Sequence, residues 1–327
     1  MKRPTRTAGA VLIAALVFVA LTAPWLAPND PRVQHPDLAF APPMRPHVIA
    51  EDGSFHAPFV YPLTSVDRLE RRFAPDTSKP TAIRFFSDGR VATTGNAASW
   101  FPLGADPLGR DVFSRLAHGA RLSLSVAATA TLLAIVVGAF AGAVAGYAGG
   151  LLDRSIMSIA DFVIILPAAY VVVTLRSAMP LRLSDTTVFW TIVLVLAAAS
   201  WPLPARGVRA IVAAEREQAY AESAYAAGAG PLRILLHHLL PAASGHLATQ
   251  AFLLFPAFIL AEATLSYLGL GFAEPSASWG VMLRDAGNVA VIAEAPWILS
   301  PAAAIVLAVL ATHLVTERDA DGTAIRF

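Results

Sequence analysis

Residues Leu122–Leu152 read LSLSVAATATLLAIVVGAFAGAVAGYAGGLL and contain no Asp, Glu, Lys or Arg. A helix needs about 20 mostly apolar residues to cross the hydrocarbon core of a bilayer, and this stretch is longer than that. The rest of the chain is similar in character, because 56% of its 327 residues are hydrophobic and only 14% are charged. Soluble domains carry roughly 25% charged residues. The sequence therefore predicts a helical membrane protein.

Five further stretches are long and nearly free of charge, which predicts an all-α polytopic protein with six transmembrane helices. They are residues 7–29, 155–175, 186–205, about 246–272 and 295–316. Basic residues precede the first stretch, as in a signal peptide, but its apolar run continues to Leu26 and Pro24 makes a poor cleavage context. We therefore expect an uncleaved first span.

The basic residues of the short connections predict the orientation, since cytoplasmic connections carry an excess of Lys and Arg. With the N-terminus inside, the cytoplasmic pieces hold Lys2, Arg3, Arg6, Arg154, Arg206, Arg209, Arg216, Arg233, Arg318 and Arg326. The short outer connections then hold Arg176, Arg182 and Arg284. Both termini are therefore predicted to be cytoplasmic.

The long connection after the first span, residues 30–121, is predicted to lie outside. Its many prolines favour an irregular but ordered loop on the outer face. The alternative is a short strand-turn-strand at residues 83–91, where Asp88-Gly89 suits a tight hairpin. Near its end, Val112, Phe113, Leu116, Ala117 and Ala120 fall on one helical face, with Arg110, Arg115 and His118 off it. This pattern predicts an amphipathic helix along the outer interface.

The stretch Glu217–Pro241, between the fourth and fifth spans, reads EQAYAESAYAAGAGPLRILLHHLLP. Its helix formers predict a first helix, ended by Gly228 and Gly230, which can take the left-handed conformation. Pro231 suits the first position of a second helix, and Pro241 marks where that helix breaks. The sequence predicts a cytoplasmic two-helix bracket that another protein can approach closely; the alternative is a plain loop packed on its own spans.

The bracket resembles the EAA loop of ABC-importer permeases. The resemblance rests on Glu222-x-Ala224-x-x-x-Gly228 and, nine residues later, His238-x-Leu240-Pro241. Where that loop usually has Ala, this chain has Ser223, which is also small. In the family this loop forms coupling helices that sit in a groove of the cytoplasmic ATPase. The resemblance thus implies a set of ATPase-coupling residues, namely Glu222, Ser223, Ala224, Gly228, His238, Leu240 and Pro241.

Other segments resemble the C-type permease subunit of dipeptide/oligopeptide (and nickel) transporters. They are PLGADPLGRDVFSRLAHGARLSL at 102–124, EATLSYLGLG at 262–271 and SWGVML at 278–283. Together the matches cover most of residues 102–312. The C-terminus departs from the family pattern, because residues 313–321 read HLVTERDAD.

The resemblance implies the permease subunit of an ATP-driven importer in a bacterial plasma (inner) membrane, forming half of the path for di- or oligopeptides. It implies a homologous second permease, two cytoplasmic ATP-binding subunits and an extracytoplasmic solute-binding protein as partners. The expected parts are 1–29 (tail and first helix), 30–121 (outer loop), 122–317 (five-helix core with the coupling loop at 215–241) and 318–327 (cytoplasmic tail).

We expect no chemical step, cofactor or metal in this chain. The only lysines, Lys2 and Lys79, do not follow glycine as a P-loop lysine does. The sequence has no cysteine, so it offers no thiolate ligand or nucleophile. The net charge of +1 gives no reason to expect a nucleic-acid partner.

Ionisable side chains inside spans are costly, so Asp161 and Glu262 need a role or a partner. We take Asp161, Glu262 and Ser266 as candidates for the pathway or gate; the favoured alternative for the two acids is a partner on a neighbouring element. Other cargo, such as nickel or another small solute, stays open. An ion-coupled secondary transporter and an intramembrane hydrolase that uses Ser266 are the rivals from other classes.

Overall fold

The computed structural model describes residues 4–50, 53–67, 70–95, 99–166, 170–171, 174 and 184–316. These form two units. Unit 1 contains the described residues of Met1–Gly9, Ser125–Glu262 and Thr312–Phe327, and unit 2 contains those of Ala10–Leu124 and Ala263–Ala311. The tail predicted at residues 318–327 lies outside the described residues.

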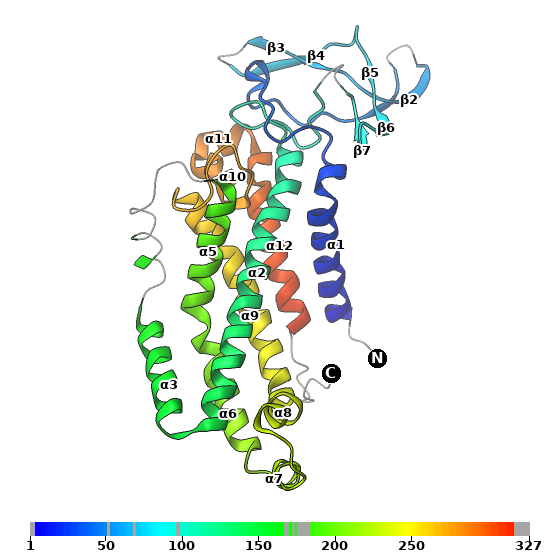
Figure 1. Ribbon diagram of the computed structural model, residues 1–327. Coiled ribbons are helices and arrows are strands. Elements are labelled where there is room, and N and C mark those ends of the chain that lie inside the picture. Colours follow the sequence, from blue (N-terminus) through cyan, green and yellow to red (C-terminus); the bar gives the residue numbers. More distant parts are fainter. Residues whose placement is uncertain are drawn as a thin grey trace. The chain divides into compact units, whose positions relative to one another are not determined.

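The longest apolar stretches form the helices α1 (Pro4–Leu26), α2 (Val112–Ala148), α9 (Ser244–Tyr267) and α12 (Ser300–Thr316) (Figure 1). Within the described ranges, four helical stretches are long and apolar enough to cross a membrane: Thr5–Leu26, Val112–Ala148, Pro231–Tyr267 and Pro296–Thr316. The chain is thus a polytopic helical membrane protein. The predicted third span, 155–175, is described mainly as α3 (Gly150–Ile165).

The predicted fourth span is longer than expected and bent. It comprises α5 (Asp185–Ser200) and α6 (Pro202–Glu215), which meet at an angle of 41° and would together make a fifth membrane-crossing stretch. Pro202 stands at the first position of α6, where its missing N–H is tolerated. Proline is the usual cause of so sharp a bend. The helix therefore bends at Pro202 and continues to Glu215, past the predicted end of the span at residue 205.

Helices α2 and α6 of unit 1 touch at the backbone. Gly138, Gly142 and Gly146 on α2 are four residues apart, so they lie on one face. A Cβ atom at Gly142 would lie 2.3 Å from the carbonyl oxygen of Ala205, and one at Gly146 would lie 2.6 Å from that of Arg209. Small residues at this spacing are the common way for membrane helices to approach, because lipid gives no hydrophobic drive for their association.

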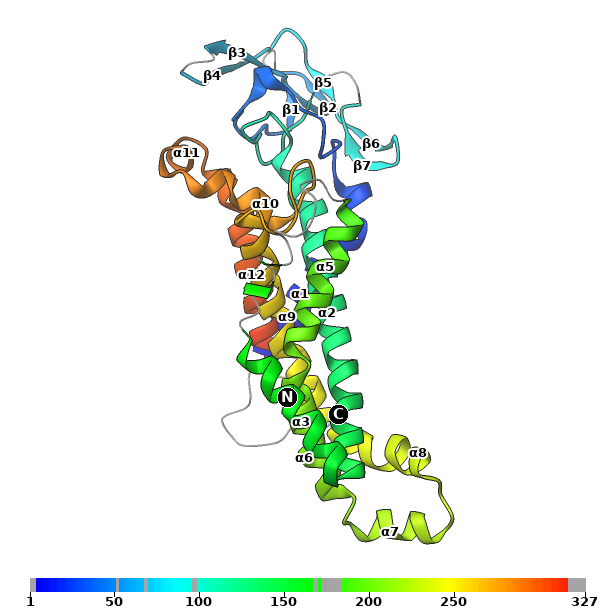
Figure 2. The ribbon, with the colours of Figure 1, turned by 60° about the vertical axis from the view of Figure 1, so that its left-hand side comes forward.

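After α6 the chain forms the bracket, defined here as residues 219–243. It contains α7 (Ala219–Ala226), α8 (Pro231–Ile234), a π turn (Leu235–Leu239) and a 3-10 turn (Leu240–Ala243). Figure 2 shows α7 and α8 joined by a turn beyond the end of α6. The predicted two-helix form is therefore confirmed as local structure.

In unit 2, residues 28–111 form small sheets, so the expectation of an irregular loop is wrong (Figures 1 and 2). The strands are β1 (His47–Ile49), β2 (Phe55–Val60), β3 (Leu63–Asp67), β4 (Arg72–Pro75), β5 (Thr81–Ala82), β6 (Arg84–Ser87) and β7 (Arg90–Thr93). They pair in the orders β1-β2-β5, β3-β4 and β6-β7, antiparallel throughout. A small core holds them together, formed by Ala41, Met44, Val60, Ile83, Phe101 and Ala105.

At Asp88-Gly89 the structure has the alternative, a tight hairpin. Strands β6 and β7 pair Ser87 with Arg90, and the two turn residues have φ of 54° and 70°. Two positive φ values define the turn type whose twist suits a two-residue hairpin, and Asp-Gly tolerates them.

The interfacial helix expected near residues 112–120 is not a separate element. These residues are the first turns of α2, which continues to Ala148. Arg110 and Arg115, expected on the polar side, are instead almost fully buried, with 1% and 0% of their surface exposed. The helical-face argument fails because both guanidinium groups have carboxylate partners within unit 2, as described below.

The segment after α9 in unit 2 forms two short helices, α10 (Trp279–Leu283) and α11 (Val289–Glu294). Trp279 is buried, its backbone N–H donates to Ser123 Oγ at 3.2 Å, and its indole N–H donates to the Leu116 carbonyl at 3.2 Å. Gly119 leaves room for this ring, since a Cβ there would lie 2.9 Å from it. The SWGVML segment therefore packs on the start of α2.

Candidate functional site

The turn of the bracket follows from its glycine and proline residues. Gly228 has φ of +80°, and the N–H groups of Gly228 and Ala229 donate to the carbonyls of Tyr225 and Ala224 at 3.0 and 3.1 Å. This is the Schellman arrangement, in which a left-handed glycine satisfies the last carbonyls of a helix. A side chain at Gly228 would meet nothing within 4 Å, so the glycine is required by the backbone conformation alone.

Gly230 does not take the predicted left-handed conformation. Its φ is −69° and its ψ is 158°, and it stands as the N-cap of α8 with Pro231 as the first helical residue. One left-handed residue is enough to end α7, so the second glycine is free to start the next helix. The prediction for Pro231 is confirmed, because proline fits the first turn of a helix.

The joint with α9 is a change of helix type rather than a break. The Leu240 N–H donates to the Leu235 carbonyl, five residues back, at the end of the π turn. Pro241 is the second residue of the 3-10 turn that leads into α9. Proline has no N–H, so a carbonyl group of the preceding turn loses its usual donor. A change from α to π hydrogen bonding supplies the carbonyl groups there with other donors.

The inner face of the bracket packs on α2 and α6. Its buried side chains are Ala221, Ile234, Leu235, Leu239 and Ala243, which meet Ala143, Val208 and Val212. Of the predicted coupling residues, Ala224 and Leu240 pack against this core, whereas Glu222, Ser223, His238 and Pro241 are exposed. The structure thus gives the bracket an apolar inner face and a mixed outer face, where polar residues lie among exposed apolar side chains such as Leu232 and Leu236.

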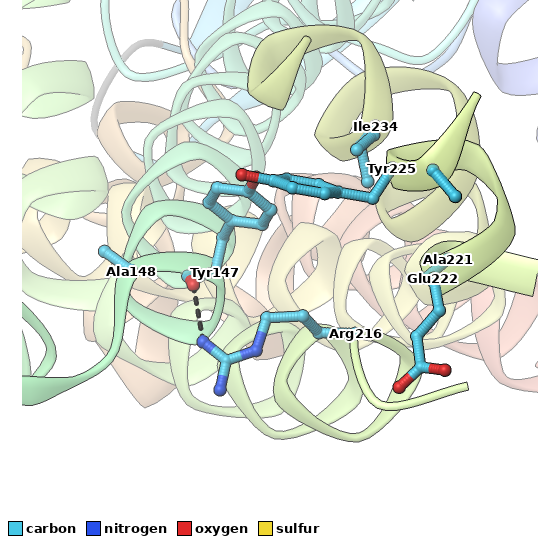
Figure 3. A pocket seen from close by; sticks show the side chains of 8 residues that line it. Tyr147, Ala148, Arg216, Ala221, Glu222, Tyr225 and Ile234 are labelled. Atoms are coloured by element: carbon cyan, nitrogen blue, oxygen red, sulfur yellow. Dashed lines mark hydrogen bonds between the residues drawn. The ribbon is translucent and has the colours of Figure 1, made fainter. Parts of the chain in front are cut away.

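A cavity of about 530 Å³ lies between the bracket and the ends of α2 and α6. It is lined by Tyr147, Ala148, Arg216, Ala221, Glu222, Tyr225, Ala226 and Ile234 (Figure 3). Arg216 Nη1 donates to the Tyr147 carbonyl at 2.6 Å and so ties α6 to the end of α2. The predicted coupling residue Glu222 therefore shares a hollow with a fixed cation and two tyrosines.

Two ion pairs join α3 to α6 in unit 1. Arg209 binds Asp153 through two hydrogen bonds of 3.0 and 2.6 Å, and Arg206 pairs with Asp161. Asp161, a predicted pathway candidate, thus has a basic partner on a neighbouring helix. This is the alternative that the sequence favours for it.

Glu262 and Ser266 lie one turn apart on α9 and are both fully buried. Ser266 Oγ accepts the backbone N–H of Phe272 at 3.1 Å. A Cβ atom added at Gly271 would lie 2.5 Å from Ser266 Oγ. Ser266 therefore holds the turn that follows α9, which is a structural role.

Unit 2 contains a cluster of four charged residues that the sequence does not reveal. This cluster, called the clamp below, consists of Asp106, Arg110, Arg115 and Glu274. Arg110 donates to Asp106 Oδ2 at 2.6 Å, and Arg110 and Arg115 each donate to Glu274 Oε1 at 3.0 Å. Burial alone would raise the pKa of Glu274, but the hydrogen bond with Arg110 and the two guanidinium charges bring it below its usual value. The clamp fixes the segment before α2 to the one after α9.

Within the described ranges, no three His, Asp or Glu side chains gather where they could hold a metal ion. The bracket offers helix ends, small residues and one carboxylate, that of Glu222.

Comparison with known families agrees with the motifs. Residues 121–318 match the family described as binding-protein-dependent transport system inner membrane component, and residues 1–43 match the N-terminal TM domain of oligopeptide transport permease C. The chain belongs to this permease family. Members of the family are ABC transporter subunits that work with separate ATPase and binding-protein partners.

Two relatives and one solved structure illustrate the similarity. The di/tripeptide transport system permease protein DppC of Pseudomonas aeruginosa is 31% identical over 315 residues, which cover 95% of this permease and 86% of the relative. The oligopeptide transport system permease protein OppC of Bacillus subtilis is 34% identical over 224 residues, covering 68% and 70%. The MetNI methionine ABC transporter in an inward-facing form matches 62% of this permease and 92% of its own chain at 18% identity, with a TM-score of 0.48.

Proposed function

We propose that this permease forms half of the pathway of an ATP-driven importer for di- or oligopeptides, with the bracket as its contact to the cytoplasmic ATPases. The cargo is carried over from the printed names of relatives, which include a di/tripeptide and an oligopeptide transport permease. In this proposal a second, homologous permease supplies the other half of the pathway, and a solute-binding protein delivers the peptide from outside.

The topology of the proposal has six spans with both termini in the cytoplasm of a bacterial inner membrane. The helices α1, α2, α9 and α12 each supply one span, and α5 with α6 supplies the bent one. The stretch predicted at residues 155–175, described mainly as α3, is the remaining span of the proposal. The strand-bearing residues 28–111 then face outside and the bracket faces the cytoplasm, as the basic residues of the connections indicate.

The observation that carries the coupling proposal is the two-faced bracket. Glu222 and Ser223 are exposed on α7, while Ala221 of the same helix is buried against the core that contains Val208 and Val212 of α6. A force applied to the outer face of α7 therefore passes directly into α6. The glycine contact and the bond from Arg216 to the Tyr147 carbonyl pass it on to α2.

Each predicted coupling residue has a role in this scheme. Gly228 sets the turn, and Glu222, Ser223 and His238 face the ATPase. Ala224 and the pair Leu240-Pro241 anchor the bracket and form its joint with α9. For Asp161 and Ser266 we propose packing roles, since the first pairs with Arg206 and the second holds Phe272.

A pull-down with matched glycine variants tests the proposal. The detergent-solubilised permease is co-expressed with candidate ATP-binding subunits, as the native chain, as Gly228→Val and as Gly230→Val. Valine is strained at a φ of +80° but fits an extended N-cap, and neither position has a neighbour within 4 Å. We expect Gly228→Val to lose the ATPase and Gly230→Val to keep it.

Two further measurements complete this test. Glu222→Lys should weaken ATPase retention without disturbing the fold, because the side chain is exposed. Reconstituted complex should take up labelled dipeptide in an ATP-dependent manner. If the native chain retains no ATPase, or if both valine variants retain it equally, the bracket is not the coupling element.

A further inference from the structure

A second cavity, of about 320 Å³, lies among residues 29–99 of unit 2, and the coupling scheme makes no use of it. It is lined by Asn29, Asp30, Val33, His35, Arg90, Gly95 and Ser99. Pockets for small molecules span about 300–1,000 Å³, so this one suits a ligand at the small end of that range. Among the described residues that line it, Val33 is the one large apolar side chain, so this part of the lining is polar.

The cavity is lined by one acid and one base that do not neutralise each other. Asp30 and Arg90 form no ion pair with one another or with any residue in the described part of the chain. Each is held locally instead: Asp30 Oδ1 accepts the Arg32 N–H at 2.8 Å, and Arg90 Nη1 donates to the Pro28 carbonyl. The walls of the cavity thus offer opposite charges to a ligand.

Neutral polar groups complete the lining. Ser99 Oγ and His35 Nε2 are 2.9 Å apart, and burial lowers the pKa of His35, which keeps its imidazole neutral at physiological pH. Two hydrogen bonds hold Asn29 in place: its Nδ2 donates to Asp111 Oδ2 at 3.0 Å, and its backbone N–H donates to Ser114 Oγ at 3.2 Å. The site is therefore preformed rather than assembled by a ligand, which reduces the entropy lost on binding.

We propose that this cavity binds a small zwitterion with free α-ammonium and α-carboxylate groups, an amino acid or a dipeptide. Arg90 would bind the carboxylate, for which a guanidinium offers several N–H donors in a fixed fork. Asp30 would accept the ammonium group. Because the lining residues come entirely from residues 29–99, the inference does not depend on the bracket or on ATPase contact.

Binding to the full-length permease in nanodiscs tests the proposal by calorimetric titration. The probes are alanine, alanyl-alanine, N-acetyl-alanyl-alanine and alanyl-alanine amide, so that each charged end is removed in turn. We expect saturable binding of alanine or of alanyl-alanine, and whichever binds more tightly sets the size of the ligand. Loss of either charged end should weaken binding about tenfold or more, the effect of losing one charge-assisted contact.

Charge-neutral variants locate the binding. Asp30→Asn keeps an oxygen for the Arg32 N–H, so the local turn is retained while the charge is lost. Arg90→Gln removes the cation, and Arg90→Lys restores it. We expect about tenfold weaker binding for Asp30→Asn and Arg90→Gln and recovery in Arg90→Lys. The control is Arg84→Gln, an exposed residue of β6 that does not line the cavity.

Two results would overturn the proposal: no saturable binding of either unblocked probe, or binding that Asp30→Asn and Arg90→Gln leave unchanged. The second result would place the ligand elsewhere in the permease. ATPase retention by Asp30→Asn should equal that of the native chain, so failure here is distinguishable from failure of the coupling proposal.

Discussion

Two contacts in this permease hold distant segments together by opposite means. In unit 1, Gly138, Gly142 and Gly146 remove side chains so that α2 can touch the backbone of α6. In unit 2, the long side chains of Arg110 and Arg115 join Asp106 to Glu274. The first contact fails when atoms are added, and the second fails when atoms are removed.

The difference follows from what each contact replaces. Between helices in lipid the gain comes from close van der Waals packing, because lipid tails are as apolar as the side chains they replace. A buried charge has instead lost its water, and only its partners compensate for that loss. The clamp should therefore be the more sensitive of the two to a single substitution, and the following measurements test this order.

The largest effect is expected for Arg115→Met. The methionine roughly preserves the length of the side chain but leaves Glu274 with Arg110 as its remaining partner in the clamp, and removing one member of a buried charge cluster costs about 3–5 kcal/mol. The measurement is unfolding in mixed micelles, followed by tryptophan fluorescence. The double variant Arg115→Met with Glu274→Gln should recover part of the loss. If the double variant is as unstable as the sum of the single ones, the two side chains are not coupled.

The next effect is a dependence of stability on pH that originates at Asp111, which caps the start of α2. Burial raises its pKa from 3.8 to about 6, against the opposing hydrogen bonds from Ser114 and Asn29. A carboxyl with a raised folded-state pKa favours folding when protonated, so its contribution is present below about pH 4 and is lost as the pH rises through about 6. At about 1.4 kcal/mol per pH unit, the loss approaches about 3 kcal/mol.

Comparison of the native chain with Asp111→Asn between pH 4 and 7 isolates this contribution from other titrating groups. The native side chain accepts the Phe113 N–H on Oδ1 and the Ser114 N–H on Oδ2, and asparagine keeps one of these two acceptor oxygens while removing the titrating group. The free energy of unfolding of the native chain should fall relative to that of the variant as the pH rises. Parallel curves for the two proteins would contradict the assignment to Asp111.

A smaller effect is expected for Gly142→Ala. Its methyl group would lie 2.3 Å from the Ala205 carbonyl oxygen, so α2 and α6 must move apart, at a cost of about 1–3 kcal/mol. The matched control is Gly245→Ala on α9, where a methyl group meets nothing within 4 Å. The control should be neutral or stabilising by up to about 1 kcal/mol, because alanine favours a helix. Equal stability of the two variants would show that the helices do not touch at Gly142.

The features that the sequence predicts well are decided by neighbouring residues. The turn at Gly228 and the helix start at Pro231 each depend on residues within a few positions of each other, and both are found. The Asp88-Gly89 hairpin, the alternative to an irregular loop, is also local. The bend before α6 could also have been found, since Pro202 and Pro204 stand at the expected end of the span. Such rules identify where the chain turns but not what it meets.

The features that the sequence misses depend on distant partners. The helical-face pattern predicts a polar, exposed Arg110, because it carries no information on Glu274, 164 residues away in the chain. The glycine spacing on α2 is visible in the sequence, but its partner α6 is not. The sheets of residues 28–111 were missed because their strands have two to six residues, too few to show an alternating pattern. The glycine and proline residues of the bracket predict its two helices, whereas its packing on α2 and α6 is seen only in the structure.

The smallest effect is expected for Glu294→Gln, which has the same chemistry as Glu274→Gln in a different setting. Glu294 and its partner Arg71 are 61% and 37% exposed, whereas Glu274 is 39% exposed and the two arginines that bind it are 2% and 0% exposed. Exposed pairs contribute about 0–1 kcal/mol, since water replaces the lost partner. The stacking of Arg71 on the Phe40 ring, 4.1 Å from its centroid, stays intact in this variant.

Unfolding of both variants at low and high salt should show a small, salt-sensitive loss of stability for Glu294→Gln and a larger, salt-insensitive loss for Glu274→Gln. Equal losses would mean that burial of the arginines does not set the strength of the clamp.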